Sequence, residues 1–359
     1  LLSEDRREHF ISETVAEYDA IRTRFEEQGT ARRGISLAQA RARRCAIDWA
    51  RVAPPAPSYL GPRAYDDIAL DDIVPYIDWT PFFHAWELKG AWPRILDDPK
   101  VGEAARDLHN DAQKMLARII DEKILGARAV VGFWPANSAV DDIEIYIDGG
   151  RGELRAVLHT LRQQADKTGS RPNYALADFT APKETGIEDY IGAFAVSAGF
   201  GTQAAAQAFE DSGDDYSAIM VKALADRLAE ALAEYMHERV RRELWGYASS
   251  EALDNDARID EDYQGIRPAP GYPACPDHTE KATLFELLDA PAAAGITLTE
   301  SFAMLPAASV SGFYFWHPDA CYFGLGKIGR DQVEDYAVRK GISVIEAERW
   351  LAPNLGYGG

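Results

Sequence analysis

Cysteine is scarce in this chain, and no apolar run is long enough to span a membrane. Only three of the 359 residues are cysteines, Cys45, Cys275 and Cys321. This odd, low number argues against a framework of disulfides and favours a reducing compartment, so we expect a cytoplasmic protein. No apolar stretch approaches the roughly 18–20 residues that cross a bilayer. The charged start, Leu1-Leu2-Ser3-Glu4-Asp5, does not fit a signal peptide, and its lack of Met suggests a piece of a longer chain.

Positive charge is also in short supply. The chain has 38 Lys and Arg against 58 Asp and Glu, which gives a net charge of −20. Such an acidic surface repels phosphate backbones and anionic lipids, so neither nucleic acid nor membrane is expected as a partner. The charge favours solubility and suits a cofactor or partner that carries positive charge.

Apolar periodicity predicts runs of strands beside runs of helices, without regular alternation. This arrangement is typical of an α+β fold with a largely antiparallel sheet. A turn at 137–142 between two strand-like runs predicts a hairpin. The connector after a short basic helix at 35–47 is expected to be irregular through Gly61 and Pro62. Helices are expected at 2–28, 99–124, 203–211, 215–244, 284–288, 331–340 and 343–351, and strands at 130–135, 143–148, 154–161, 174–179, 190–196, 310–316 and 322–325.

Two motifs suggest sites that their surroundings do not support. Gly324-Leu-Gly326-Lys-Ile-Gly329 matches the dinucleotide pattern, but only thirty residues follow it, too few for the rest of a Rossmann half. Cys275-Pro-Asp-His278 and His317-Pro-Asp-Ala-Cys321 have spacings that resemble zinc ligation. Prolines crowd both segments and no further histidine lies close in sequence, so we expect no metal.

No motif in the chain indicates a hydrolase. There is no G-x-S-x-G, and His237 on the predicted helix 215–244 fits a surface or capping residue better than a general base. On the same helix Glu230 and Glu234 are one turn apart, so both carboxylates leave one face. A solvated face explains such a pair, but the alanines around it make the helix thin enough for a ligand to approach.

The segment Arg267–His278 is the most unusual part of the chain. Four prolines and Gly271 make it stiff and extended, and unable to continue a sheet ladder. Arg267 offers a forked donor that suits a carboxylate, and Tyr272 offers a flat ring with a polar tip. The segment could be a rigid ligand-binding rim or a proline-rich crossover packed on the surface.

Longer motifs resemble one known family over about residues 45 to 357. Besides Arg267–His278, they include 76–83, 141–146, 222–230, 308–315, 330–337 and 348–357. Together they are similar to the S-adenosylmethionine-binding activation, or reactivation, domain at the C-terminus of cobalamin-dependent methionine synthase. The resemblance implies a C-shaped α+β domain at 63–359, with a twisted antiparallel sheet flanked by helices and no Rossmann fold. It assigns 1–28 to the last helix of the preceding cobalamin-binding module and 29–62 to a linker.

The resemblance also implies an activity. The full enzyme transfers a methyl group from methyltetrahydrofolate to homocysteine through cobalamin, which a neighbouring module holds. The activation domain binds S-adenosylmethionine and supports reductive methylation of inactive cob(II)alamin, with flavodoxin or a flavoprotein reductase as electron donor. Two alternatives stay open: a docking or sensing module that binds S-adenosylmethionine and recruits the reductase, and a reactivator of another corrinoid methyltransferase.

The resemblance implies a role for individual residues as well. It places Arg267 at the ligand carboxylate, Asp78 and Glu230 at the cationic groups, and Tyr322 and Phe323 in contact with the ligand. The backbone of Ala274 is expected to bind adenine, and Tyr272 is expected to face the corrin. No residue is expected to act as a catalytic acid or base, because methyl transfer to cobalt releases no proton.

Overall fold

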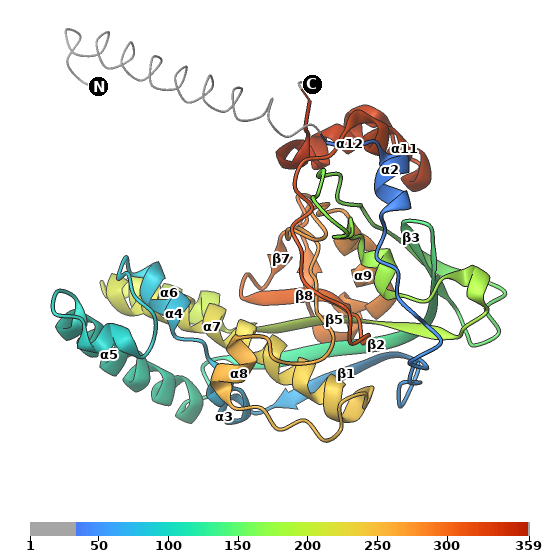
Figure 1. Cartoon of the computed structure of the whole chain (residues 1–359). Helices are drawn as coiled ribbons and strands as arrows, with labels where there is room; N and C mark the ends of the chain where they lie inside the picture. Colours follow the sequence, from blue (N-terminus) through green and yellow to red (C-terminus); the bar gives the residue numbers. More distant parts are fainter. Residues whose placement is uncertain (1–33, 358–359) are drawn as a thin grey trace, which may run out of the picture. The chain divides into compact units, whose positions relative to one another are not determined.

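The computed structural model describes residues 34–357, which divide into two compact units (Figure 1). The larger unit comprises Ala46–Thr160 and Ala175–Phe323. The smaller unit contains Leu161–Tyr174 together with 34–45 and 324–357. The helix expected at 2–28 lies outside the described residues. No helix in the described part of the chain combines the length and apolar character that a membrane crossing needs.

A six-stranded sheet forms the centre of the larger unit. Its strands follow the order β4-β3-β2-β5-β8, and β1 also pairs with β2. Every pairing is antiparallel, which confirms the α+β prediction and leaves no place in this sheet for a Rossmann unit. The strands are β1 (Gly61–Ile68), β2 (Gly126–Ala139), β3 (Asp142–Tyr146), β4 (Leu154–His159), β5 (Asp189–Phe200) and β8 (Ser309–Tyr314); a separate pair joins β6 (Thr297–Leu298) and β7 (Met304–Leu305).

The predicted hairpin is present between β2 and β3. Ala139 pairs with Asp142, so Val140 and Asp141 make the turn. Val140 has a φ of 59°, the left-handed conformation that tight hairpin turns require. The expected turn and both flanking strands are therefore confirmed.

Residues of the central strands alternate between two buried faces. Ala129, Val131 and Phe133 of β2 belong to the same core as Leu224, Leu228 and Leu232 of the long helix α7 (Asp215–Arg239). Figure 1 shows α7 lying along the sheet, where it contacts β5 and β8. The short helix α9 (Glu280–Leu288) also contacts the sheet, and its buried leucines lie outside that core. The sheet is thus a rigid base for α7 and the segments beside it.

Most predicted helices are confirmed, with small shifts at their ends. The larger unit contains α3 (Leu70–Ile73), α4 (Thr80–Ala85), α5 (Gly102–Asp121), α6 (Thr202–Asp211), α7, α8 (Asn255–Ile259), α9 and α10 (Ala290–Ala294); a π-helical turn, Val240–Leu244, extends α7 to the predicted end at 244. The smaller unit contains α2 (Leu37–Ala42), α11 (Arg330–Lys340) and α12 (Val344–Trp350). Short 3₁₀ turns lie at Val74–Tyr76, Arg94–Asp97, Leu176–Phe179, Lys183–Thr185 and Ala352–Asn354.

Three expectations about strands were wrong. Residues 174–179 form no strand, because the Asp178 carboxylate accepts the N–H of Ala175 at 3.0 Å and closes a 3₁₀ turn, Leu176–Phe179. Residues 322–325 are irregular, and the ring of Phe323 packs edge-on against Phe179 instead of joining the sheet. Conversely, β1 begins at Gly61, inside the stretch that was expected to be irregular.

The smaller unit has its own core around Leu161, Ile328 and Tyr336. Gln332 of α11 pairs with the backbone of Arg162, accepting its N–H at 2.7 Å and donating to its carbonyl at 2.8 Å. The glycines of 324–329 form the irregular approach to α11, which starts after Gly329.

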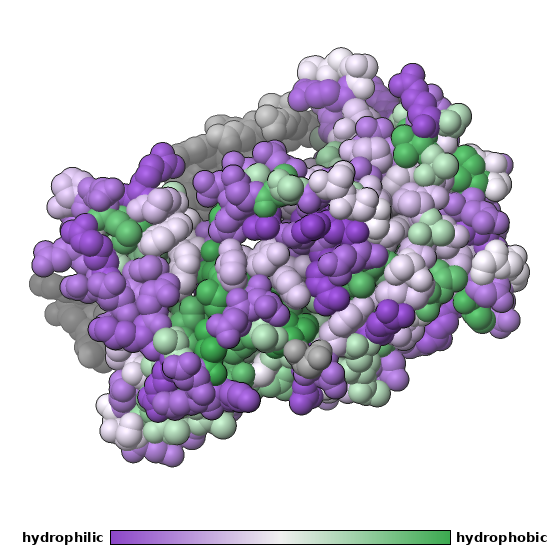
Figure 2. Space-filling model, turned by 90° about the horizontal axis from the view of Figure 1, so that it is seen from below, coloured by the Kyte–Doolittle hydropathy of each residue, from purple (hydrophilic) through white to green (hydrophobic). Residues whose placement is uncertain are grey.

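Hydrophilic residues predominate on the face of the molecule in Figure 2, where hydrophobic ones gather in a smaller central area.

Candidate functional site

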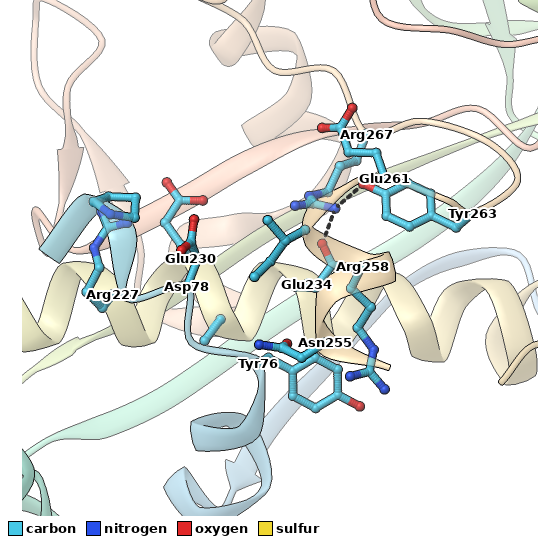
Figure 3. A pocket seen from close by; sticks show the side chains of 13 residues that line it. Tyr76, Asp78, Arg227, Glu230, Glu234, Asn255, Arg258, Glu261, Tyr263 and Arg267 are labelled. Carbon is cyan, nitrogen blue, oxygen red and sulfur yellow. Dashed lines mark hydrogen bonds and ion pairs between the residues drawn. The ribbon is translucent and has the colours of Figure 1, made fainter. Parts of the chain in front are cut away.

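A cavity of about 310 Å³ lies beside α7 in the larger unit (Figure 3). One wall is the α7 face that carries Arg227, Glu230 and Glu234. Asp78 comes from the segment before α4, and helix α8 (Asn255–Ile259) contributes Asn255, Arg258 and Ile259. Arg267 enters from the start of the proline-rich segment. Three parts of the sequence, around Asp78, on α7 and from Asn255 to Arg267, therefore meet around one cavity that carries many charged side chains.

Helical periodicity explains how α7 supplies three charged groups to this cavity. Residues 227, 230 and 234 are spaced by three and four, which places them on one face, as Figure 3 shows. Ala231 lies between Glu230 and Glu234 in the cavity wall, and its short side chain lets a ligand approach the α7 backbone there. Alanines 229 and 233 are buried in the core and do not line the cavity.

Asp78 is held in place by the helix that follows it. Its Oδ1 accepts the N–H of Thr80 at 2.9 Å, at the first residue of α4. A carboxylate at this position satisfies a backbone donor that the helix itself leaves free. Asp78 and Glu230 both line the cavity, where two carboxylates favour a cationic ligand.

Arg267 makes three contacts through a single nitrogen. Its Nη1 lies 2.6 Å from Oε2 of Glu234, 2.9 Å from the hydroxyl of Tyr263 and 3.1 Å from Nδ1 of His237. Burial by itself lowers the pKa of Arg267, but Glu234 and the surrounding tyrosines together hold that pKa above its usual value. Arg267 therefore stays charged, and its Nε and Nη2 have no side-chain partner among the described residues.

A second arginine supports Glu234 from deeper in the unit. Arg241 is fully buried, and its Nη1 lies 3.6 Å from Oε1 of Glu234. Its Nε donates to both carboxylate oxygens of Glu251 at 2.9 Å. Two arginines and two glutamates thus form a largely buried network, in which each charge has a partner of opposite sign.

The proline-rich segment is anchored at the edge of the sheet. Ile266 exchanges two backbone hydrogen bonds with Phe315, and the carbonyl of Pro268 accepts the N–H of Phe313 at 2.9 Å. Gly312 of β8 permits this approach, because a Cβ there would lie 2.7 Å from the Pro268 oxygen. Among the described residues, the segment forms backbone hydrogen bonds with β8 and Phe315 only at these points, as expected of a stretch so rich in proline.

Tyr272 and Ala274 lie in a tight turn beyond this anchor. The N–H of Cys275 donates to the carbonyl of Tyr272 at 2.9 Å, and Tyr272 is 58% exposed. Burial, followed by the negative charge of Glu230, a residue that lines the cavity, raises the pKa of Tyr272. Ala274 is buried, and its backbone makes no hydrogen bond to another described backbone group.

Tyr322 joins the site, whereas Phe323 packs elsewhere. The Tyr322 hydroxyl accepts the backbone N–H of Arg267 at 3.0 Å. Phe323 packs against Phe179 at a centroid distance of 6.3 Å and does not line the cavity. Of the expected ligand residues, Asp78, Glu230 and Arg267 line one cavity, with Tyr322 in contact with Arg267.

The sequence did not assign several residues that the structure adds to this site. Glu234 was expected on the same face as Glu230, as a further negative charge near the cationic groups, but its ion pair with Arg267 was not expected. Tyr263 carried no local signal, because its contact with Arg267 depends on the path of the intervening loop. The expectation that His237 is a surface or capping residue was wrong, since it is 0% exposed and lies beneath Arg267.

No cluster of three or more potential metal ligands occurs in residues 34–357. Cys275 is buried. The ring of His278 packs over Gly271, where a Cβ would lie 2.3 Å from it, and its Nδ1 lies 3.2 Å from Nζ of Lys281. The contacts of His278 are those of packing and local hydrogen bonding.

Two comparisons with known proteins agree with this architecture. Residues 69–341 match the model of the family described as vitamin B12 dependent methionine synthase, activation domain. The chain is also similar to a crystal structure of the MetH reactivation domain bound to AdoHcy, with 57% sequence identity and a TM-score of 0.88. That match covers 90% of this chain and 99% of the other. The chain therefore belongs to the family of activation domains of vitamin B12-dependent methionine synthase.

Proposed function

We propose that this chain binds S-adenosylmethionine in the cavity beside α7 and supports reductive methylation of inactive cob(II)alamin. The observation that carries the proposal is the 57% identical reactivation domain, which was crystallised with AdoHcy. AdoHcy is S-adenosylmethionine without its transferable methyl group. In the full enzyme this chain would be one part of a methyltetrahydrofolate–homocysteine methyltransferase.

The charges around the cavity suit the charges of S-adenosylmethionine. Its methionyl end carries a carboxylate and an ammonium group, and its sulfur is a cationic sulfonium. The Nε and Nη2 of Arg267 are suited to bind the carboxylate side-on, in the bidentate geometry that arginine favours. Asp78 and Glu230 supply negative charge for the cationic groups. The backbone N–H and C=O of Ala274 would bind adenine, and Tyr322 would complete the ligand contacts, whereas Phe323, which packs against Phe179, would not take part.

The chain contributes to the reaction by positioning the ligand. When the methyl leaves, the carbon–sulfur bond breaks and its electron pair stays on sulfur, which yields neutral AdoHcy. No proton is released, so no general acid or base is required. Cobalamin, held by the neighbouring module and reduced by flavodoxin or a flavoprotein reductase, would accept the methyl group. Tyr272, exposed near the cavity, would face the corrin.

Arg267→Ala tests the assignment of the cavity. We expect this change to weaken S-adenosylmethionine binding by about 2–4 kcal/mol, because a ligand carboxylate loses a charge-assisted pair. Isothermal titration calorimetry measures the effect. The matched control is Arg118→Ala on α5, whose guanidinium is half exposed and paired with Glu122. Equal affinities of wild type and Arg267→Ala would remove Arg267 from the site.

Two other functions make different predictions. A module that only senses S-adenosylmethionine and recruits the reductase would bind both, yet would yield no methylcobalamin when mixed with a cobalamin-binding module, reductant and ligand. A reactivator of another corrinoid methyltransferase would methylate the cobalamin of that protein in preference to that of methionine synthase. Methylcobalamin formation, followed by absorbance with each cobalamin module, separates the three.

A further inference from the structure

His237 is a buried titratable group that the proposed function does not use. It lies on α7, three residues after Glu234, and is 0% exposed. Its Nδ1 is 3.1 Å from Nη1 of Arg267. The cavity is lined by Arg267 but not by His237. The imidazole therefore contacts the back of the guanidinium.

The chemistry of the two groups fixes where the imidazole proton lies. A guanidinium has only donors, so Nδ1 of His237 must accept the hydrogen bond. A neutral imidazole has one acceptor and one donor, which places its proton on Nε2. This Nε2 is buried and has no hydrogen-bond partner in the described part of the chain. His237 thus acts on Arg267 as a neutral acceptor.

The surroundings of His237 favour this neutral form. Burial, followed by the positive charges of Arg241 and Arg267, holds its pKa well below the usual histidine value. The charged or titratable groups that face it are those two arginines, Tyr263 and Tyr314, with Glu234 one turn earlier on α7. The rings of Tyr314, 17° from parallel at 5.2 Å, and Tyr263, edge-on at 4.9 Å, hold the imidazole in place.

Arg267 has more acceptors at Nη1 than it has hydrogens there. Nη1 carries two hydrogens, while Glu234, Tyr263 and His237 all lie within 3.1 Å of it. If a ligand carboxylate weakens the ion pair between Glu234 and Arg267, the neutral groups of Tyr263 and His237 can still accept both Nη1 hydrogens. An arginine fixed in this way loses less rotational freedom when it binds a ligand.

We propose that His237 is a positioning residue, which holds Nη1 of Arg267 from behind the cavity and so presents the Nε–Nη2 edge to a ligand carboxylate. This inference rests on the proposed binding of S-adenosylmethionine. It adds that the orientation of Arg267 depends on a neutral acceptor at the position of Nδ1.

A double-mutant cycle on ligand affinity tests the inference. His237→Phe removes the acceptor and keeps the ring, whereas His237→Asn places an amide oxygen near the position of Nδ1. By calorimetry with S-adenosylmethionine, we expect His237→Phe to weaken binding about tenfold, the loss of roughly one hydrogen bond. His237→Asn should stay within about threefold of wild type. In an Arg267→Ala background, His237→Phe should have no further effect.

The opposite results would overturn the inference. Equal losses in His237→Phe and His237→Asn would show that only packing matters, and an undiminished loss in the Arg267→Ala background would show that His237 does not act through Arg267. If wild type binds no S-adenosylmethionine, the proposed function fails instead. Should His237→Phe not fold, ¹⁵N NMR of the wild-type imidazole still decides: a ring protonated at Nε2 alone at pH 6 supports the inference, and a doubly protonated ring refutes it.

Discussion

Glu230 and Glu234 show how one helical turn separates two roles for the same side chain. Glu230 is exposed and lines the cavity, and no Lys or Arg of residues 34–357 forms an ion pair with it. Glu234 is only 8% exposed and lies between Arg267 and Arg241. In the proposed function Glu230 would therefore face the ligand, whereas Glu234 supports Arg267.

At the residue scale, Glu234→Gln should lower the free energy of unfolding by about 1–3 kcal/mol. The amide cannot neutralise two arginines that are largely removed from water, so their charges are left less compensated. Urea unfolding followed by circular dichroism measures the effect.

The matched control is Glu230→Gln, the same chemical change one turn earlier. Its effect on unfolding should stay within about 0.5 kcal/mol because the side chain is exposed. Glu230→Gln should therefore change ligand affinity more than it changes stability. Equal stability losses in both variants would contradict the separation of roles.

At the level of elements, the edge of the sheet fixes the start of the proline-rich segment. The Pro268 carbonyl reaches β8 only because residue 312 is glycine, since a Cβ there would also lie 3.0 Å from the Phe194 ring. Arg267 stands between the two anchored residues, Ile266 and Pro268. The orientation of its backbone is therefore set by the sheet and not by the stiffness of the prolines alone.

Gly312→Ala should move this segment away from β8. We expect a loss of about 1–3 kcal/mol in stability from overpacking, together with weaker binding of S-adenosylmethionine. Thermal unfolding and calorimetry measure the two effects.

Ser311→Ala, at the neighbouring position of the same strand, is the control. Its hydroxyl is buried without a hydrogen-bond partner in the described residues, so its removal should be nearly neutral. Unchanged ligand affinity in Gly312→Ala would show that the anchor does not position Arg267.

At the scale of the whole molecule, two buried groups make the free energy of unfolding change with pH in opposite directions. The pKa of His237 in the folded chain is held well below the usual 6.5. The unfolded chain therefore takes up this proton at a higher pH than the folded chain, and stability falls as the pH drops below about 6.5. Asp189 is buried, and burial raises its pKa from 3.8 to about 6. Asp189 has the opposite effect on stability. The folded chain takes up this proton at a higher pH than the unfolded chain, so stability rises as the pH falls below about 6.

Comparison of wild type with His237→Asn isolates the histidine. Below pH 6.5 we expect wild type to lose about 1.4 kcal/mol per pH unit more than the variant, the value for one proton. Urea unfolding at pH 7.5, 6.5 and 5.5 measures this difference. Parallel curves for the two proteins would show that His237 titrates normally in the folded state.

A further whole-molecule prediction concerns metal. Cys275, His278, His317 and Cys321 have spacings that resemble zinc ligation, yet we expect chelator-free protein to carry no stoichiometric zinc. Elemental analysis of protein purified without chelators decides this. One equivalent of zinc per chain would restore the metal interpretation.

The sequence by itself determined the α+β class, the hairpin at 137–142, the extent of α7 and the shared face of Glu230 and Glu234. These features follow from local periodicity and turn chemistry, which neighbouring residues set. It also carried the resemblance that led to Arg267 and Asp78.

Only the tertiary structure decided which face of α7 meets Arg267, that residues 174–179 turn instead of pairing, and that His237 is buried beneath a guanidinium. It also decided that the loop beginning at Arg267 is anchored to β8. These features depend on contacts between residues that are distant in sequence, such as Gly312 with Pro268 and His237 with Arg267. Local propensity cannot encode such contacts, because the energy of each side chain depends on which partner the fold brings to it.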